Sequence, residues 1–164
     1  MGRARSVAAT AGVLVVAVAL VVLAGFAGAG YYNLSTAEAA QLSRTQLRQL
    51  AFDSVPKVFG FDYQTVEASM TEAEGLLTPA YRTEFAERAK TDIIPAARER
   101  RLVTQVTVTG AGVLDAHRDT GSVLVFMNRT VTDKSKKSQY DGSRLRVDFT
   151  RVDGHWLINY IVPV

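Results

Sequence analysis

The most uniform hydrophobic stretch of the chain covers residues 7–32, in which no side chain is charged. A helix of these 26 residues would be about 39 Å long at about 1.5 Å per residue, and the hydrocarbon core of a bilayer is about 30 Å thick. Tyr31 and Tyr32 fall where aromatic side chains gather at a membrane interface. The pattern therefore predicts a transmembrane helix over residues 7–32.

Basic residues around this segment predict its orientation. Arg3 and Arg5 precede it, whereas only Arg44 lies within about 15 residues after it, and the positive-inside rule places the more basic flank in the cytoplasm. We therefore expect a single-pass protein of the plasma membrane, with residues 1–6 in the cytoplasm and residues 33–164 in an extracytoplasmic domain.

A cleaved signal peptide is the alternative interpretation of the hydrophobic segment. Ala27-Gly28-Ala29 has the small-residue pattern of a cleavage site. The hydrophobic run is longer than the usual length of about 7 to 15 residues, which favours a retained membrane helix. The domain lies outside the cytoplasm under either interpretation.

Apolar residues that recur every three or four positions predict three helices in the domain, over residues 36–59, 62–74 and 79–101. Pro56 predicts a kink or an early stop in the first helix, which Gly60 would end in any case. In the second helix, Asp62 is expected to be the N-cap and Gly75 to close the element. Thr78-Pro79 is a strong start for the third helix, which Pro95 should bend or split.

Alternating apolar and polar residues take over after the helices and predict four strands, over residues 102–114, 122–132, 143–152 and 155–162. Asp153-Gly154 between the last two strands is a tight hairpin signal. The polar, basic segment 132–139 is expected to be a mobile hairpin loop. Helices followed by hairpin-connected strands predict an α+β domain, in which three helices pack on one face of a curved, four-stranded antiparallel sheet and close a half-open cone.

Composition limits the functions open to the chain. Its 164 residues suit one small domain after a hydrophobic leader. The absence of cysteine excludes disulfides and thiol catalysis, and no cofactor or metal is expected. Arg3 and Arg5 are two of the 19 basic residues, so the rest of the chain has 17 basic and 16 acidic residues. This balance argues against nucleic acid as a partner.

Few residues are candidates for chemistry. His117 and His155 lie beside strand turns, where a surface position is the simpler interpretation than a catalytic or metal-binding role. Asp62, Tyr63 and Asp148 could meet as an acid/base group inside a cone. We prefer to interpret them as a helix cap, a core tyrosine and a solvent-facing strand residue.

Two further features could contact a partner or ligand. The cluster of Lys134, Lys136 and Lys137 could touch anionic lipid head groups or an acidic protein, although such a run is more often a solvated loop. Trp156 could stack on a ligand, but its place in an alternating strand favours packing against the sheet.

Several local strings occur along the chain in a fixed order. They are Phe61-Asp62-Tyr63-Gln64-Thr65, Leu76-Leu77-Thr78 with Tyr81-Arg82-Thr83-Glu84-Phe85, Val125-Phe126-Met127-Asn128, Asp141-Gly142-Ser143-Arg144-Leu145-Arg146-Val147 and Val152-Asp153-Gly154-His155-Trp156-Leu157. Together with the single hydrophobic span, they resemble the Mce-associated membrane proteins, accessory proteins of the mammalian-cell-entry lipid transport systems of actinobacteria. The resemblance covers nearly the whole chain.

The resemblance implies an NTF2-like or cystatin-like cone without established catalysis, which supports the assembly or stability of a lipid-importing envelope complex. The family-signature residues, all interpreted as structural, are Asp62, Tyr63, Asp141, Gly142, Ser143, Arg144, Asp153, Gly154 and Trp156. The expected partners are Mce or permease subunits, the membrane and, in one alternative, lipid.

Three functional hypotheses follow. The first is a non-enzymatic accessory subunit that docks on transport proteins. The second is a lipid-binding module that uses the cone interior directly. The third is an isomerase or hydrolase of the cone-fold type, which requires Asp62, Tyr63 and Asp148 to lie close together around an open cavity.

Overall fold

The structure is a computed structural model that describes residue 41 and residues 44–164. The predicted cytoplasmic residues 1–6, the predicted transmembrane helix 7–32 and the beginning of the predicted helix 36–59 lie outside these residues. Within the described part of the chain, no helix combines the length and the apolar character needed to span a membrane.

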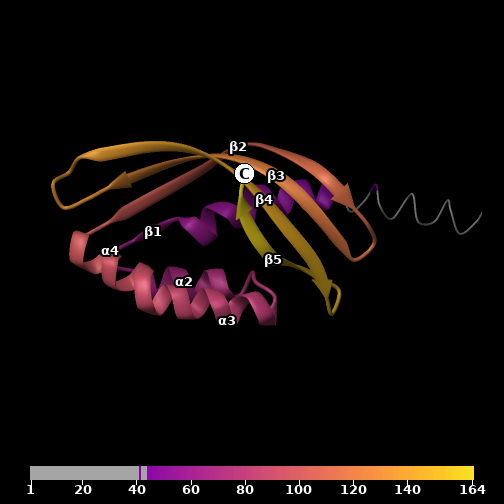
Figure 1. The fold of residues 1–164 in the computed structure, drawn as a ribbon, viewed down its shortest axis with the longest axis horizontal. Helices are drawn as coiled ribbons and strands as arrows, with labels where there is room; N and C mark the ends of the chain where they lie inside the picture. The colour runs from indigo at the N-terminus through magenta and orange to yellow at the C-terminus, as the bar shows by residue number, and fades with distance from the viewer. Residues whose placement is uncertain (1–40, 42–43) are drawn as a thin grey trace, which may run out of the picture. The chain divides into compact units, whose positions relative to one another are not determined.

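Three helical stretches cover one face of a single sheet, as the sequence predicts (Figure 1). The first runs over residues 44–59 and the second is α2, Val66–Glu74. The third consists of α3 (Pro79–Arg88), a π-helical turn η1 (Ala89–Ile93) and α4 (Ile94–Arg100).

The two prolines within helices behave differently. The helix over residues 44–59 passes through Pro56 and ends at Gly60, so the early stop expected near Val55 is wrong. Val55 and Val58 are buried, and their packing holds the helix together across the missing proline N–H. Pro95 does split its run, because the wide π-helical turn immediately before it makes room for the proline ring.

The start of α2 also differs from the sequence-based expectation. Phe61–Asp62 forms a two-residue strand, β1, and the Asp62 carboxylate accepts a hydrogen bond from the Gln64 backbone N–H at 2.9 Å. The N-cap is Thr65 rather than Asp62. Asp62 therefore stabilises the turn between strand and helix, since aspartate readily bonds the backbone two residues on.

The sheet has five antiparallel strands in the order β1-β2-β3-β4-β5. The long strands are β2 (Val103–Ala116), β3 (Thr120–Thr132), β4 (Ser138–Val152) and β5 (His155–Pro163). The sequence predicted four strands, so β1 is an addition, and β4 begins five residues earlier than expected. Register shifts in β2 and between β4 and β5 are irregularities that favour bending, and Figure 1 shows the resulting curvature.

The helix-facing side of the sheet carries the hydrophobic core. Alternate residues of β3 and β4 point into it and are buried: Val123, Val125, Met127, Leu145, Val147 and Phe149. Leu47 and Ala51 of the first helix are fully buried in the same cluster. The alternation in the sequence thus correctly predicts which face of each strand is buried.

Two turns form as their sequences predict. Asp153 and Gly154 join β4 to β5 with φ values of 51° and 82°, the left-handed backbone that a two-residue hairpin turn requires. Thr78 caps α3 by accepting a hydrogen bond from the Tyr81 N–H, and Pro79 is the first helical residue. The Thr78 hydroxyl also bonds the Asn159 side chain of β5 at 3.2 Å, which ties the start of α3 to the sheet.

Candidate functional site

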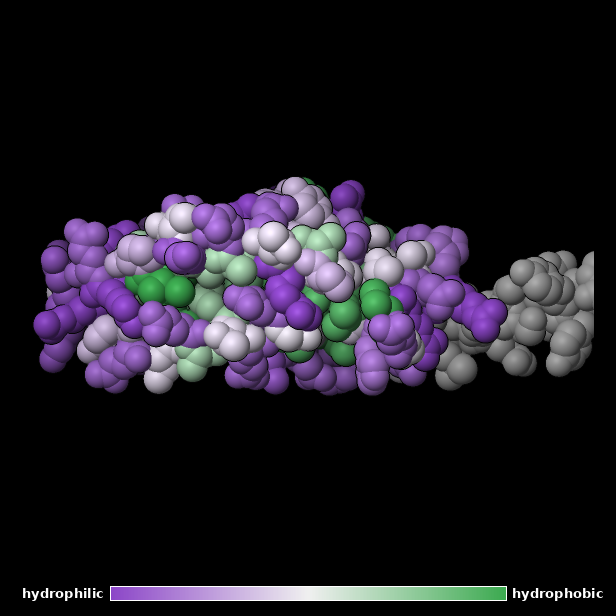
Figure 2. Space-filling view, turned by 90° about the horizontal axis from the view of Figure 1, so that it is seen from below, coloured by the Kyte–Doolittle hydropathy of each residue, from purple (hydrophilic) through white to green (hydrophobic). Residues whose placement is uncertain are grey.

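One end of the cone is hollow. The hairpin of β3 and β4 extends past the end of β5, because Pro163 pairs with Leu145 and residues 138–144 of β4 continue beyond it. A cavity of about 670 Å³ lies between this part of the sheet and the helices α3 and α4. In Figure 2, which views the helix side, apolar surface is visible between polar side chains.

The wall of the cavity is mostly apolar on the helix side and at the near strands. Phe85 of α3 and Leu102 are almost fully buried, and Phe61 and Ile161 are half-buried. All four side chains line the cavity. The cavity is therefore continuous with the hydrophobic core rather than separated from it.

Polar residues replace apolar ones on the inner face of β3 and β4 as the strands pass over the cavity. The inward series Val123, Val125, Met127 continues with Arg129, and the inward series of β4 continues from Leu145 back to Ser143 and Asp141. Arg129 and Asp141 are direct partners in the register of the two strands. Period-two alternation therefore places a charged pair on the core side of the sheet.

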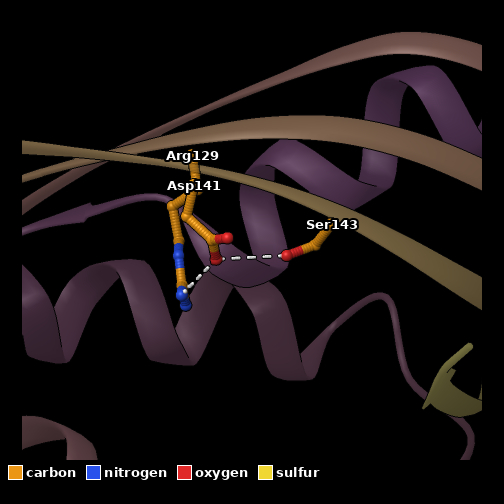
Figure 3. A network of polar contacts seen from close by, with 3 residues as sticks. All are labelled: Arg129, Asp141 and Ser143. Atoms are coloured by element: carbon orange, nitrogen blue, oxygen red, sulfur yellow. Dashed lines mark hydrogen bonds and ion pairs between the residues drawn. The ribbon is translucent and has the colours of Figure 1, made fainter.

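Arg129, Asp141 and Ser143 form a connected network (Figure 3). Arg129 Nη2 donates to Asp141 Oδ2 at 2.8 Å, and the Ser143 hydroxyl donates to the same oxygen at 3.2 Å. The Arg129 and Asp141 side chains are 40% and 42% exposed, so the ion pair faces the open part of the cavity. A pair this accessible stabilises the fold by only about 0–1 kcal/mol.

Arg129 has hydrogen-bonding capacity left over. Within the described residues, its Nε is the only buried side-chain nitrogen or oxygen without a hydrogen-bond partner. A guanidinium has five N–H donors, and an unpaired buried donor is costly. The charged pair is thus a functional candidate. Asp141 is a family-signature residue interpreted as structural, and Arg129 is not among the candidates from the sequence, although an arginine stands where the inward alternation predicts a hydrophobic residue.

Further charged residues surround the cavity. Arg88, Asp92 and Arg100 of the helical layer contribute to its lining, and Arg88 pairs with exposed Glu84 at 2.7 Å. With Arg129 and Asp141, the lining therefore has three cationic and two anionic side chains. Because Glu84 offsets Arg88, these lining charges and the Glu84 partner balance.

The basic loop next to the cavity is shorter than the predicted segment 132–139. It covers only residues 133–137, and the backbone N–H of Lys134 donates to the Arg100 carbonyl at 2.9 Å, which ties the loop to the end of α4. Asp133 accepts hydrogen bonds from the Ser135 hydroxyl at 2.6 Å and from the Ser135 N–H at 2.8 Å. These bonds hold the pKa of Asp133 below its ordinary value. Lys134, Lys136 and Lys137 remain exposed.

Tyr81 of α3 is the titratable group most affected by burial in the cavity wall. Removal from water raises the pKa of Tyr81 above 10.0, and the nearby Arg88 cation partly opposes this rise. Its ring meets Tyr160 of β5 edge-on, with centroids 5.4 Å apart. The phenol is therefore held neutral, between helix and sheet.

The alternative in which Asp62, Tyr63 and Asp148 meet as an acid/base group is not found in the structure. Asp62 pairs with Val103 of β2, which lies opposite Thr132 at one end of β3, whereas Asp148 lies opposite Ser122 near the other end. Ten residues of a strand span roughly 33 Å. Asp148 instead accepts a hydrogen bond from the Ser122 hydroxyl at 2.6 Å and pairs with Arg146 at 3.2 Å.

The preferred interpretations of those three residues hold for two of them. Tyr63 is half-buried and packs against the core. Asp148 lies on the face of β4 opposite Val147 and Phe149, away from the core. Asp62 is the exception, because it stabilises a turn and does not cap a helix.

The remaining candidate residues have structural or surface positions. Gly142 and Arg144 lie on the outer face of β4, opposite to Asp141 and Ser143. Trp156 is half-buried, packs on the core and donates its Nε1–H to Gln46 at 3.3 Å, as expected for sheet packing.

The two histidines are at the surface. His117 lies in the turn between β2 and β3, where Nε2 is 3.0 Å from Asp115, and His155 begins β5. Both side chains are exposed, as the surface interpretation predicts. Among the described residues, no three His, Asp or Glu side chains are grouped to hold a metal ion.

A curved antiparallel sheet with three helical stretches on one face and a cavity at one end defines an α+β domain, the class expected from the sequence. The domain superposes on the periplasmic domain of DotI with a TM-score of 0.64 at 14% identity, over 74% of this chain and 95% of that one. CagV, a VirB8 homologue of the type IV secretion system of Helicobacter pylori, gives a TM-score of 0.57 at 6% identity, over 72% and 95% of the two chains. The expected α+β domain, with helices on one face of a curved antiparallel sheet, is thereby confirmed with β1 added, whereas the expected transmembrane helix lies outside the described residues.

At the level of sequence, the chain is similar to a mycobacterial protein. "Outer membrane protein Rv1973" of Mycobacterium tuberculosis is 24% identical over 125 residues, which are 76% of this chain and 78% of that protein. No family model matches the chain.

Proposed function

We propose that the chain is a non-enzymatic, membrane-anchored accessory subunit of an Mce-type lipid or sterol import complex. Residues 33–164 would support assembly or stability of that complex outside the cytoplasm. The proposal is carried by the combination of a charge-free segment, residues 7–32, with a domain whose fold is that of the periplasmic domain of DotI. A small folded domain held at a membrane offers a defined surface to neighbouring proteins without chemistry of its own.

Two similarities support this proposal. The mycobacterial relative is named an outer membrane protein, and one structural neighbour with the same fold is described as a component of a type IV secretion system. The strings shared with Mce-associated proteins favour lipid import over secretion as the process served.

Binding is favoured over catalysis by the geometry of the one acid/base group that the sequence suggested. Asp62 and Asp148 lie about ten residues apart along the sheet, and Asp148 is on the outer face. The isomerase or hydrolase hypothesis, in the form that uses these residues, is therefore wrong.

Affinity capture tests the accessory role. The full chain, tagged at its C-terminus and expressed at its natural level, is purified from gently solubilised membranes of cells that contain an Mce system. We expect Mce or permease subunits to be recovered and, in a strain without this chain, the level of those subunits to fall. Recovery of none of them together with an unchanged level would contradict the proposal.

A reporter fused after Val164 tests the orientation separately. The reporter should be active only outside the cytoplasm, because Arg3 and Arg5 favour a cytoplasmic N-terminus. Cytoplasmic activity would reverse the topology and leave the domain unable to meet an extracytoplasmic complex.

A second candidate function, a lipid-binding module, is favoured by one specific observation. Side chains do not fill the interior of the cone, because a partly open cavity of about 670 Å³ lies next to the core. Ligand pockets in proteins commonly have volumes of about 300–1,000 Å³ and mostly apolar walls.

A further inference from the structure

The cavity has two chemically different sides. The apolar wall includes Phe61, Phe85, Leu102 and Ile161. Arg129 and Asp141 provide a polar wall on the sheet side, and Asp141 also accepts a hydrogen bond from Ser143. A wholly apolar ligand would leave the polar wall without partners, and a small polar ligand would leave the apolar wall wet. An amphipathic molecule satisfies both sides.

The charges of the cavity select the sign of the polar group. The three lining arginines are balanced by Asp92, Asp141 and Glu84, the ion-pair partner of Arg88, so any positive excess must come from neighbouring residues. The adjacent loop adds three exposed lysines against the single carboxylate of Asp133. A cleft lined by an excess of one sign attracts ligands of the opposite sign, so the field here favours an anion.

Arg129 is the group best placed to bind that anion. Its side chain is 40% exposed, and among the described residues its guanidinium makes one hydrogen bond, from Nη2 to Asp141, which leaves Nη1 for an acceptor in the cavity. Guanidinium donors bind carboxylates and phosphates through charge-assisted hydrogen bonds, which are about twice as strong as neutral ones. A second acceptor in the cavity would use donors that the fold leaves free.

We propose that the cavity binds an amphipathic molecule with one anionic head group, such as a long-chain fatty acid, with the head group at Arg129 and the chain along Phe85, Leu102 and Ile161. This inference deepens the lipid-binding candidate and goes beyond the accessory role, which needs no ligand. The cavity volume lies within the range of known ligand pockets.

Photo-crosslinking tests the proposal on the full chain in phosphatidylcholine nanodiscs. The probe is a 16-carbon fatty acid with a diazirine in its chain, and the matched probe is the corresponding 16-carbon alcohol. Labelled peptides are mapped by mass spectrometry. We expect the acid to label peptides from α3 through β2 at least about tenfold more than the alcohol, and excess unlabelled palmitate to compete.

Two arginine variants give a matched comparison. Arg129→Gln removes the inward guanidinium, whereas Arg146→Gln removes an outward guanidinium of β4 that is similarly exposed, at 46%, and also pairs with an aspartate. Loss of a hydrogen bond to a charged group predicts at least about a tenfold loss of acid labelling for Arg129→Gln. Labelling of Arg146→Gln should equal that of the wild type.

A third variant tests the cavity independently of its charge. Ala96 lines the cavity and is half-buried, so Ala96→Phe fills space without touching the network. We expect it to reduce labelling by both probes. Circular dichroism of each variant establishes that it is folded, and if Arg129→Gln does not fold, Ala96→Phe and the comparison of the two probes still decide the question.

Three results would overturn the inference. They are equal labelling by acid and alcohol, labelling confined to residues 7–32, and a response of Arg129→Gln no different from that of Arg146→Gln. Affinity capture with Arg129→Gln separates this inference from the accessory role. Retained transport subunits with lost labelling would support both ideas, whereas normal labelling of the wild type, with no transport subunits captured by the wild type, would contradict only the accessory role.

Discussion

The two ends of the inner sheet face are built from the same strands and yet differ in what covers them. At one end, Val125 is fully buried in a core that includes Leu47 of the first helix. At the other end, Val131 of the same strand and the same face is only half-buried and lines the cavity. The comparison teaches that alternation decides which way a side chain points, while the neighbouring elements decide whether it meets protein or empty space.

The largest expected effect comes from shortening the two valines in turn. Val125→Ala should lower the free energy of unfolding by about 2 kcal/mol, because deleting buried methyl groups leaves a void in close-packed surroundings. Val131→Ala should cost less than about 1 kcal/mol, because its side chain already borders a cavity. Denaturant titration of the full chain in mild detergent measures both. Equal losses would mean that the hollow end is packed as tightly as the core.

A pair of glycines sharpens the comparison with a smaller effect. A Cβ at Gly121 would collide with the Leu47 side chain and lie 3.0 Å from the Asp115 carbonyl oxygen. Gly121→Ala should therefore cost about 1 kcal/mol through overpacking, because the closest atom is the flexible end of the Leu47 side chain.

Gly142, on the outer face of β4, is an uncrowded control for Gly121. A Cβ there has ordinary van der Waals room, 3.7 Å from the Asn128 side chain. Gly142→Ala should be neutral or stabilise the fold by up to about 1 kcal/mol, because alanine reduces the entropy of the unfolded chain. The same denaturant titration applies, and a loss at Gly142 as large as that at Gly121 would contradict the close packing of Gly121 against the first helix.

The sequence predicted the packed end better than the hollow one. Alternation in β3 and β4, the Asp153-Gly154 turn and the Thr78-Pro79 helix start are local signals, and each is found in the structure. They work because burial, turn geometry and capping depend on residues close together in the chain.

The hollow end depends on pairing between distant residues. Asp141-Gly142 looks like a turn, but pairing with Arg129 and Asn128 makes it part of β4. The two-residue strand β1 is too short to show a period and exists because β2 offers it an edge. A cavity lies between several elements, so the hydrophobic periodicity of any one element does not predict it. Arg129 was nevertheless detectable, as a charge at an inward position.

The smallest expected effect concerns the pH dependence of stability. Burial raises the pKa of Tyr81, so between the ordinary value of 10.0 and the higher folded value the unfolded chain ionises first. The unfolded state then binds fewer protons than the folded state, and the free energy of unfolding falls as pH rises through this window. Below pH 10.0 the effect is absent. Because Tyr81 lines the cavity, a larger fall in the free energy of unfolding means that less water reaches this part of the cavity wall.

A Tyr81→Phe variant isolates this contribution. We expect its stability to fall less steeply with alkaline pH than that of the wild type, and the wild type to show one phenolate absorbance transition above pH 10.0 that the variant lacks. Superimposable stability curves for the two proteins would mean that water reaches the Tyr81 hydroxyl freely. The wall of the cavity beside α3 would then be wet, and the apolar part of a ligand would have to be held by the opposite strands instead.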